Sequence, residues 1–256
     1  MLPKISIVIP SYNKAKYIGA TLKSIFNQNY QNLEVIIQDG GSTDGTVDII
    51  KEFAKKHKII WVSKKDKGQL DAINKGLKKT TGDILTYLNA DDVYNPLALN
   101  KVVAGFGAHP KALWLVGAGN VIDDGGKVIS KLTTSYKNFL LSINKYPFLL
   151  MVNYLTQPSV FLTKKSYKEY GPFVGRKEYV LEYDFWLKLG RVEMPQVLPN
   201  LISSFRISGT NISAVSYQSL LADDYNIVKK YTTNKFILFV HKLNNWGRVL
   251  IINLLK

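Results

Sequence analysis

The chain lacks several features that would assign it to a common class of protein. It contains no cysteine, which excludes disulfide bonds and thiolate metal ligands. Its three histidines, His57, His109 and His241, lie too far apart in sequence to show the spacing of a metal site. No Gly-x-Gly-x-x-Gly motif follows the first predicted strand. Zinc enzymes, Ser-His-Asp hydrolases and Rossmann oxidoreductases are therefore disfavoured.

Apolar runs long enough to cross a bilayer, about 20 residues, are absent as well. The opening Met1-Leu2-Pro3-Lys4 leads directly into a predicted strand and does not resemble a signal peptide. Acidic residues are scarce, since 34 Lys and Arg stand against 19 Asp and Glu and give a net charge of +15. We therefore expect a cytoplasmic protein with an anionic partner: a nucleic acid, a nucleotide, or the inner face of the plasma membrane.

Strand and helix patterns alternate at short intervals in the first part of the chain. Runs of β-branched and apolar residues predict strands at 5–9, 33–37, 59–62 and 84–88. Apolar residues at helical spacing follow each of the first three. Pro10 is expected to end the first strand because it cannot donate to a sheet ladder. This order predicts βαβ units and an α/β fold with a parallel-dominated sheet flanked by helices.

The rest of the chain is less regular. We expect strands at 113–116, 159–162 and 203–207, a hairpin around the Asp-Asp-Gly-Gly turn at 123–126, and a buried helix at 183–189. A helical tail begins near Tyr217. Because no repeat or low-complexity linker separates these parts, we expect one compact body that consists of residues 1–110, residues 111–215 and a tail at 216–256.

Two carboxylates mark the carboxyl end of the fourth predicted strand. Residues 84–88 are typical of a strand buried on both faces, and Asn89, Asp91 and Asp92 follow at once. Open α/β sheets bind their ligands at this edge. Adjacent carboxylates repel each other unless a cation lies between them and a ligand, so this pair predicts a divalent metal site.

The loops after the other predicted strands carry polar residues that the same edge would gather. Asn13 follows the first strand, Asp39 the second, and Asp66 and Asp71 the third. Such an edge offers acceptors for a base and a ribose, together with a metal for a diphosphate. A nucleotide diphosphate fits this set, whereas a nucleic-acid backbone would meet too many carboxylates.

These motifs resemble those of the family-2 glycosyltransferases. The resemblance lies in residues 10–13 (Pro-Ser-Tyr-Asn), 38–46, 66–76 and 88–92 (Leu-Asn-Ala-Asp-Asp), and it continues through 157–161 and 182–187. It implies the GT-A fold and the transfer of a sugar from a nucleotide sugar with inversion. Residues 1–215 would then be the catalytic domain, with 1–110 as the nucleotide-sugar-binding half and 111–215 as the acceptor-side half.

The resemblance also implies roles for individual residues. The set implied in nucleotide-sugar binding is Pro10, Tyr12, Asn13, Asp39, Gly68, Asp71, Asn89 and Asp91. Within this set, Asp39 would contact the base, which Pro10 and Tyr12 would frame. Gln157 would lie on the acceptor side.

The metal and the catalytic base are implied in the same way. Asp91, with Asp92 beside it, would bind Mg²⁺ or Mn²⁺, and the ion would offset the negative charge that grows on the leaving diphosphate. Glu182 would take the proton of the acceptor hydroxyl, with Asp184 as the alternative base. Three positions depart from the common pattern: Asn89 replaces a frequent Asp, Glu182 is one methylene longer than the usual Asp, and Ser208 replaces a frequent His.

Each candidate also has a purely structural interpretation. Asp39 suits a turn cap, Asp91 and Asp92 a capped turn, and Asp71 the first turn of a helix. The remaining candidates suit a solvated helix face (Glu182 and Asp184) or ordinary packing (Tyr12 and Gln157).

Apolar residues recur at helical spacing in the tail, and no acidic residue follows Asp224. The apolar positions are Phe236, Phe239, Val240, Leu243, Trp246, Leu250 and Leu254, with Lys235, Lys242 and Arg248 among them. One interpretation is a helix docked on the catalytic body, although Gly247 weakens it. The other, which the charge favours, is an interfacial helix on an anionic membrane surface.

The sequence therefore predicts a metal-dependent inverting glycosyltransferase that uses a UDP-linked sugar. Its acceptor would be a glycan or lipid-linked, in cell-surface polysaccharide or lipid-linked glycan synthesis. An inactive nucleotide-sugar-binding relative is the first alternative, because Asn89 and Ser208 depart from the family pattern. A basic nucleic-acid- or membrane-binding protein is the second, and no nucleic-acid partner is expected because the ligand edge is acidic.

Overall fold

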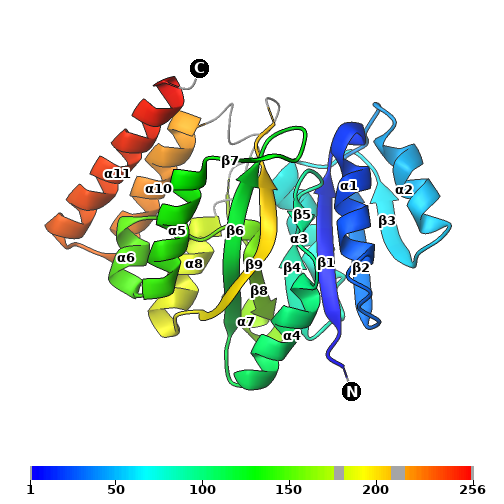
Figure 1. Ribbon diagram of the computed structural model, residues 1–256, viewed down its shortest axis with the longest axis horizontal. Coiled ribbons are helices and arrows are strands. Elements are labelled where there is room, and N and C mark those ends of the chain that lie inside the picture. The colour runs from blue at the N-terminus through cyan, green and yellow to red at the C-terminus, as the bar shows by residue number, and fades with distance from the viewer. Residues whose placement is uncertain (1, 176–181, 209–216, 255–256) are drawn as a thin grey trace.

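A computed structural model describes residues 2–175, 182–208 and 217–254 of the chain (Figure 1). The first half alternates strands and helices as predicted. Its elements are β1 (Ile5–Ser11), α1 (Ala15–Phe26), β2 (Leu33–Asp39), α2 (Thr46–Ala54), β3 (Ile59–Ser63), α3 (Gln69–Lys78), β4 (Ile84–Tyr87), β5 (Val93–Tyr94) and α4 (Ala98–Ala108).

The second half contains the predicted hairpin, the predicted buried helix and two tail helices. Its elements are β6 (Trp114–Ile122), β7 (Val128–Ile129), α5 (Lys131–Ile143), α6 (Tyr146–Met151), the 3₁₀ turn η1 (Gln157–Ser159), β8 (Val160–Thr163), α7 (Lys164–Tyr170), α8 (Glu182–Val192), β9 (Gln196–Arg206), α10 (Tyr217–Tyr231) and α11 (Lys235–Leu254).

The strands form one mixed, mostly parallel sheet in the order β3-β2-β1-β4-β8-β6-β9-β5, with β7 paired to β6. The predicted parallel arrangement holds for β3, β2, β1 and β4. Strand β8 is antiparallel to both β4 and β6, and it joins this half to the parallel pair β6 and β9. The carboxyl ends of the first strands therefore lie at one edge of the sheet, at the top of Figure 1.

The prediction that β1 stops at Pro10 is wrong. The strand continues to Ser11, with Pro10 in register with Gln38 of β2. On its other side β1 pairs with β4 only as far as Val8, opposite Tyr87. Pro10 is thus paired on one side only, where a strand tolerates the missing NH group.

Both faces of β1, β2 and β4 are buried, as predicted for the strand at 84–88. Ile7 and Ile9 of β1 face one core cluster, to which α1 and α4 contribute. Val8 faces the other cluster, to which α3, α6 and α8 contribute. This alternation fixes the direction of every side chain along β1 and thereby positions the loop that follows it.

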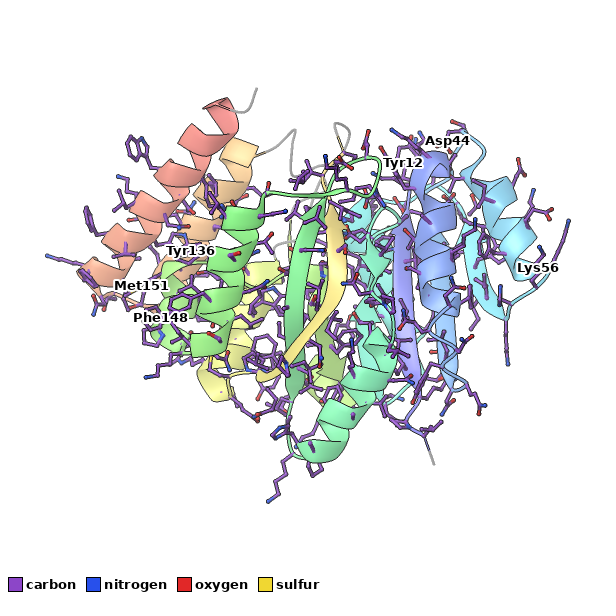
Figure 2. All side chains as sticks on the ribbon, in the orientation of Figure 1. Tyr12, Asp44, Lys56, Tyr136, Phe148 and Met151 are labelled. Atoms are coloured by element: carbon purple, nitrogen blue, oxygen red, sulfur yellow. The ribbon has the colours of Figure 1, made fainter. Side chains whose placement is uncertain are left out.

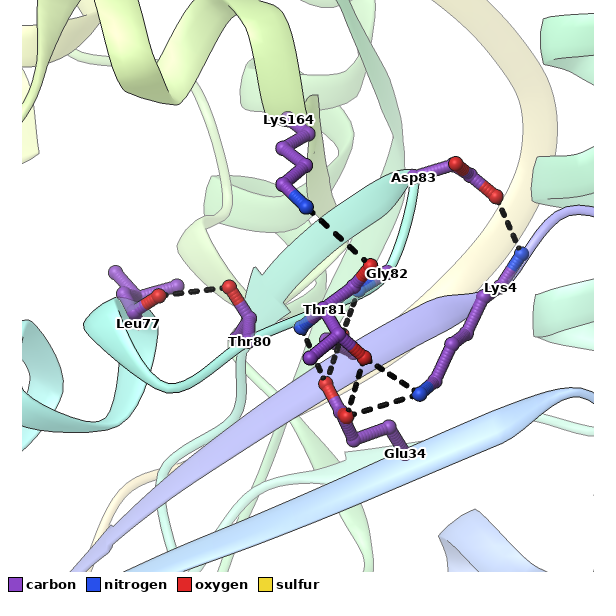
Figure 3. A network of polar contacts seen from close by, with 9 residues as sticks. Lys4, Glu34, Leu77, Thr80, Thr81, Gly82, Asp83 and Lys164 are labelled. Carbon is purple, nitrogen blue, oxygen red and sulfur yellow. Dashed lines mark hydrogen bonds and ion pairs between the residues drawn. The ribbon is translucent and has the colours of Figure 1, made fainter.

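A polar network fixes the amino ends of the same strands (Figure 3). The Glu34 carboxylate accepts hydrogen bonds from Ser6 Oγ (2.5 Å), Thr81 N (2.8 Å) and Lys4 Nζ (3.0 Å). Burial alone would raise the pKa of Glu34, but these donors lower it to about 2. Because the network joins β1, β2 and the residues before β4, it sets the relative positions of the strands that carry the candidate site at their other ends.

The tail helix α11 is docked on the body. It packs against α6 and α10, and His241 Nδ1 lies 3.0 Å from the carbonyl oxygen of Leu150. Gly247 does not interrupt the helix. No helix in the described part of the chain is long and apolar enough to cross a membrane.

Candidate active site

The loops after β1, β2 and β3 meet at the sheet edge, as expected. Ser11, Asp39 and Ser63 stand in register across the three strands. The backbone of Gly40 packs closely against two side chains. A Cβ atom added at this position would lie 3.1 Å from Asp66 Oδ2 and 3.3 Å from Tyr12 Cδ2. The ring of Tyr12 is 62% exposed and offers a free aromatic surface beside Gly40.

Asp39 organises the loop after β2. Its Oδ2 accepts from Gly41 N (3.0 Å), Ser42 N (2.9 Å) and Ser63 Oγ (2.6 Å), while Oδ1 accepts from Ser42 Oγ (2.5 Å). In the protein without a ligand, Asp39 therefore caps the turn, as its structural interpretation predicts. Since a carboxylate oxygen has two lone pairs, Oδ1 keeps one acceptor site for a ligand.

Asn13 ties the first loop to the second. Its Oδ1 accepts from Thr43 N (3.0 Å), and its backbone N donates to Ser42 Oγ (2.8 Å). Its φ of 50° is in the left-handed region, which asparagine tolerates better than most residues. The loop after β1, which includes Tyr12, is thus held in a defined position.

Asp71 and Gly68 lie at the start of α3. Asp71 Oδ2 accepts from Lys75 Nζ (2.6 Å) and from Lys67 N (3.0 Å), and the hydrogen bond from Lys75 lowers the pKa of Asp71. Gly68 has a φ of 107°, which favours glycine, and it precedes the helix directly. Asp71 is therefore a first-turn carboxylate, and its contact with the nucleotide remains a prediction.

Asp91 forms an ion pair that the sequence analysis missed. Its Oδ2 lies 2.7 Å from Lys14 Nζ, and the two side chains are only 8% and 19% exposed. Asn89, two residues earlier, accepts a hydrogen bond at Oδ1 from Gln69 Nε2 (2.8 Å). Lys14 directly follows the Pro-Ser-Tyr-Asn motif, and the motif alone gave no sign that its amine reaches the turn after β4.

Asp92 points inward rather than toward Lys14. It is fully buried, with Oδ1 accepting from Arg206 N (2.8 Å) and Oδ2 from Asn89 Nδ2 (3.2 Å). Burial, and then the charge of Asp91, raise the pKa of Asp92 well above its usual range. Arg206 Nε also donates to the carbonyl oxygen of Asp91 (2.8 Å). Asp92 and Arg206 thus join the end of β4 to β9.

The donor set around Asp91 fits a metal ion that arrives with a diphosphate. Within the described residues, no group of three or more His, Cys, Asp or Glu side chains gathers to hold an ion. Mg²⁺-type ions commonly take one or two protein carboxylates and complete their shell with phosphate oxygens and water. Asp91 supplies one such carboxylate at the sheet edge, whereas the contacts of Asp92 are directed to Asn89 and Arg206.

Glu182, the predicted base, is held by the strand that leads to Asp91. The hydroxyl of Tyr87 at the end of β4 donates a hydrogen bond to Glu182 Oε1. Burial raises the pKa of Glu182, and the hydrogen bond from Tyr87 partly opposes this effect. Gln157 lies beside the same tyrosine, because its Nε2 donates to the Tyr87 carbonyl oxygen (2.8 Å).

Asp184, the alternative base, faces the tail. It is 4% exposed and bonds to Lys188 Nζ (3.1 Å) and to the hydroxyl of Tyr231 in α10 (3.1 Å). Two residues along a helix correspond to a rotation of about 200°, so Asp184 and Glu182 point in nearly opposite directions. The alternative view of this segment as a solvated helix face is wrong for Asp184.

Asp224 is a buried carboxylate that sequence reasoning did not single out. It is 2% exposed in α10, with Arg248 Nη1 at 3.8 Å from Oδ2. Burial raises the pKa of Asp224 to about 7, and the charge of Glu182 contributes in the same direction. Burial also lowers the pKa of nearby Lys137 to about 8. The tail thus adds a buried carboxylate whose pKa responds to the charge of Glu182, and α5 adds a buried amine.

Comparison with known sequences places the chain among sugar transferases. The model of the family described as "Glycosyl transferase family 2" matches residues 6–181. An uncharacterized glycosyltransferase of Haemophilus influenzae is 27% identical over 223 residues, which cover 83% of this chain and 68% of that protein. The PGL/p-HBAD biosynthesis glycosyltransferase of Mycobacterium tuberculosis is 30% identical over 186 residues, covering 72% and 68%. An uncharacterized glycosyltransferase of Nostoc is 32% identical, and the matched residues cover only 41% of that protein.

Two solved structures share the fold. TarS residues 1–349 of S. aureus, in complex with UDP-GlcNAc, superimposes with a TM-score of 0.69 at 16% identity, covering 94% of this chain and 72% of that one. The mannosyltransferase PcManGT of Pyrobaculum calidifontis, in complex with GDP-Man and Mn²⁺, gives 0.69 at 18% identity, covering 94% and 69%. The predicted GT-A fold with C-terminal helices is confirmed.

Proposed function

Because the chain belongs to glycosyl transferase family 2, we propose that it moves a sugar from a nucleotide-sugar donor to an acceptor hydroxyl, with inversion and with the help of Mg²⁺ or Mn²⁺. One observation carries this proposal. Strand β4 connects the two candidate groups, since Tyr87 at its end bonds to Glu182 and Asp91 follows four residues later. The proposed proton acceptor and the proposed site for the leaving diphosphate would thereby both be held at the carboxyl end of β4.

The proposed donor is UDP-linked. The TarS and PcManGT structures named above contain UDP-GlcNAc and GDP-Man, which are both sugars linked to a nucleoside diphosphate. In this chain the exposed ring of Tyr12 would stack on the base, next to Pro10, and Asp39 would use its remaining acceptor site on an NH group of the base. Asn13, Gly68 and Asp71 would position the surrounding loops.

The diphosphate would lie between Asp91 and the start of α1. A bound Mg²⁺ or Mn²⁺ would offset the charge that develops on the leaving diphosphate. Asp91 would hold the ion with Asn89 beside it, and Lys14 would add a second positive charge close by. The residues that fix this arrangement are Asp92 and Arg206, which hold the end of β4 against β9.

Glu182 would act as the base. Its carboxylate takes the proton as the acceptor oxygen bonds to the anomeric carbon, and the bond from that carbon to the diphosphate breaks on the opposite side. A single displacement of this kind inverts the anomeric centre. Because burial raises the pKa of Glu182, its carboxylate is a stronger proton acceptor than an exposed one.

The proposed acceptor is a glycan or lipid-linked hydroxyl in surface polysaccharide or lipid-linked glycan synthesis. Residues 111–215 would form the acceptor side, with Gln157 placed by its bond to the Tyr87 backbone. A cytoplasmic protein on the inner face of the plasma membrane would meet such acceptors.

Calorimetric titration of UDP, GDP and their sugars, with Mn²⁺ and with chelator, tests the donor and the metal. We expect one nucleotide to bind tightly only with Mn²⁺, and Asp91→Ala to remove that dependence. Asp48→Ala is the matched control, because Asp48 is an exposed carboxylate on α2 that pairs only with Lys51 among the described ion pairs. Absence of nucleotide binding under all conditions would overturn the proposal.

A nucleotide-sugar-binding relative without turnover is the second candidate. Asn89 in place of an acidic residue and Lys14 on Asp91 both leave less negative charge for a metal ion. Donor hydrolysis separates the two candidates. A transferase releases the nucleotide in a Mn²⁺-dependent and Glu182-dependent manner, whereas a binding protein holds the donor intact.

A further inference from the structure

Helix α11 leaves an apolar stripe in contact with solvent. Phe236, Phe239, Leu243 and Trp246 are 66%, 64%, 52% and 60% exposed. At 100° per residue the four side chains fall within an arc of about 80° on one side of the helix. The opposite side docks on the body through His241 and Asn245, so the stripe is not needed for folding the helix onto the protein.

Helix α5 carries a second stripe, which the sequence did not suggest. Leu132, Tyr136 and Phe139 are 88%, 45% and 62% exposed, and they also lie on one side of their helix. The inner side of α5 is packed through Leu140 and Leu141. Single exposed apolar residues are ordinary, but two such stripes of three or four residues call for a partner.

The two stripes lie at the same end of the molecule. In Figure 1, α5, α6 and α11 form the end opposite α2 and β3. Helix α6 connects them, since it follows α5 in the chain and packs against α11. Figure 2 shows Tyr136, Phe148 and Met151 together on this side. We call the seven exposed side chains of α5 and α11 the α5/α11 surface.

The helices that carry the two stripes contain no acidic residue. No Asp or Glu occurs in residues 125–168, which contain α5 and α6, or in residues 225–256, which contain α11. Lys131 is exposed at the start of α5 and Lys145 just before α6, and Lys235 and Lys242 are exposed on α11. Apolar side chains with cations beside them and no carboxylates match the chemistry of helices that lie in the headgroup region of an anionic bilayer.

A cavity adjoins the surface. It measures about 270 Å³, opens between α10 and α11, and is lined by Leu221, Ala222, Tyr225, Lys242, Asn245 and Trp246. Its lining is mainly apolar. The lining also contains Lys242 and Trp246, and lysine and tryptophan are side chains that anchor proteins at the level of lipid headgroups.

We propose that the α5/α11 surface docks the protein on anionic lipid, with both helices in the interface. The proposal deepens the proposed function, because docking would bring the catalytic domain to acceptors that are anchored in a membrane. A second copy of the chain is a poorer occupant, because a symmetric contact would place the same lysines against one another with no carboxylate to pair them. Nucleic acid is also a poorer occupant, because the most exposed side chain of the surface, Leu132 at 88%, is aliphatic and gives a base nothing to stack on.

Vesicle flotation of the full chain tests the proposal. We expect co-flotation with vesicles of phosphatidylcholine and phosphatidylglycerol, weak binding to phosphatidylcholine alone, and loss of binding as salt rises. Phe239→Ser and Phe139→Ser should each lower the partition coefficient roughly tenfold, because each removes an aromatic side chain from the interface. Lys235→Glu with Lys242→Glu should remove the preference for anionic vesicles.

Ile60→Ser is the matched control. Ile60 is 45% exposed on β3, at the opposite end of the molecule, so its replacement should leave flotation unchanged. Circular dichroism of every variant verifies that it is folded. Asp91→Ala should float like the wild type, and Phe239→Ser should hydrolyse donor like the wild type without vesicles, so failure of the docking and failure of the catalytic proposal are distinguishable.

Several outcomes would overturn the docking proposal. One is the absence of flotation with any vesicle, and another is an effect of the α11 variant without an effect of the α5 variant. A concentration-dependent dimer in sedimentation that Phe139→Ser and Phe239→Ser abolish would assign the surface to a second copy instead. Binding of RNA that the same two variants abolish would assign it to nucleic acid.

Discussion

The Tyr87 hydroxyl donates a hydrogen bond to the Glu182 carboxylate, across 95 residues of sequence. Tyr87 is 2% exposed, and its ring stands nearly perpendicular to that of Phe173 with the centroids 5.6 Å apart, so the hydroxyl has little freedom to turn elsewhere. The bond fixes the direction in which Glu182 presents its second oxygen. Tyr87 is therefore a positioning residue for the candidate base.

Replacement Tyr87→Phe should slow transfer and move its pH profile. The hydrogen bond lowers the pKa of Glu182, so its loss should raise that pKa further. Since the base works in its ionised form, the acid limb of kcat/KM should move to higher pH, and kcat should fall roughly tenfold. Tyr154→Phe is the control, because the buried Tyr154 hydroxyl has no partner among the described residues. An unchanged acid limb would show that the bond does not affect the base.

Replacement of Glu182 and replacement of Asp184, the two carboxylates of α8, should have different effects. Glu182→Gln should lower transfer by about 10²–10⁴-fold while calorimetry shows unchanged donor binding. Asp184→Asn should instead lower the thermal midpoint, because it weakens contacts to Lys188, Lys230 and Tyr231 worth about 1–3 kcal/mol, and transfer should change little. The reverse pattern would assign the base to Asp184.

Lys14 and a metal ion should compete for Asp91. Because Lys14 Nζ lies 2.7 Å from Asp91 Oδ2, a divalent ion must share or displace it. Lys14→Met should therefore tighten Mn²⁺ binding in the absence of nucleotide, as measured by electron paramagnetic resonance. Lys16→Met serves as the control, since Lys16 pairs with exposed Asp124. Equal or weaker Mn²⁺ binding by Lys14→Met would mean that the lysine does not oppose the ion.

Asp224 should make stability depend on pH. Burial raises its pKa from 3.8 to about 7, so between these values the folded state binds more protons than the unfolded state. This contribution to stability is fully present below about pH 4 and is lost as pH rises toward 7. Asp224→Asn should accordingly be more stable than the wild type at pH 8, by a few kcal/mol at most.

Denaturant unfolding at pH 5 and pH 8 measures this difference. Asp48→Asn is the control, because the Asp48 side chain is 80% exposed. If Asp224→Asn destabilises the protein equally at both pH values, the carboxylate is ionised throughout and its pairing with Arg248 outweighs its burial.

The sequence predicted most of the fold because its signals are local. Apolar runs at 5–9, 33–37 and 84–88 specify buried strands, and the helical patterns between them supply the crossover connections that parallel pairs need. The loops that follow these strands had to meet at one edge. The predicted elements of the first half moved only at their ends, as at Pro10, whose missing NH group is tolerated because β1 is paired on one side there. Strand β5 and helices α5 and α7 were not predicted.

The sequence by itself thus determined which chemistry gathers at the edge: Asp39 in the second loop, Asp91 and Asp92 after β4, and a carboxylate in α8. Only the tertiary structure decided how these groups are used. Lys14 lies 77 residues from Asp91, and Asp224 is buried near Glu182, although each looks like a surface residue in its own segment. The sequence pattern of a helix or strand indicates which of its faces is buried, whereas three-dimensional packing determines which residue each side chain contacts. For that reason a step of two residues in α8 separates the carboxylate that faces Tyr87 from the one that faces the tail.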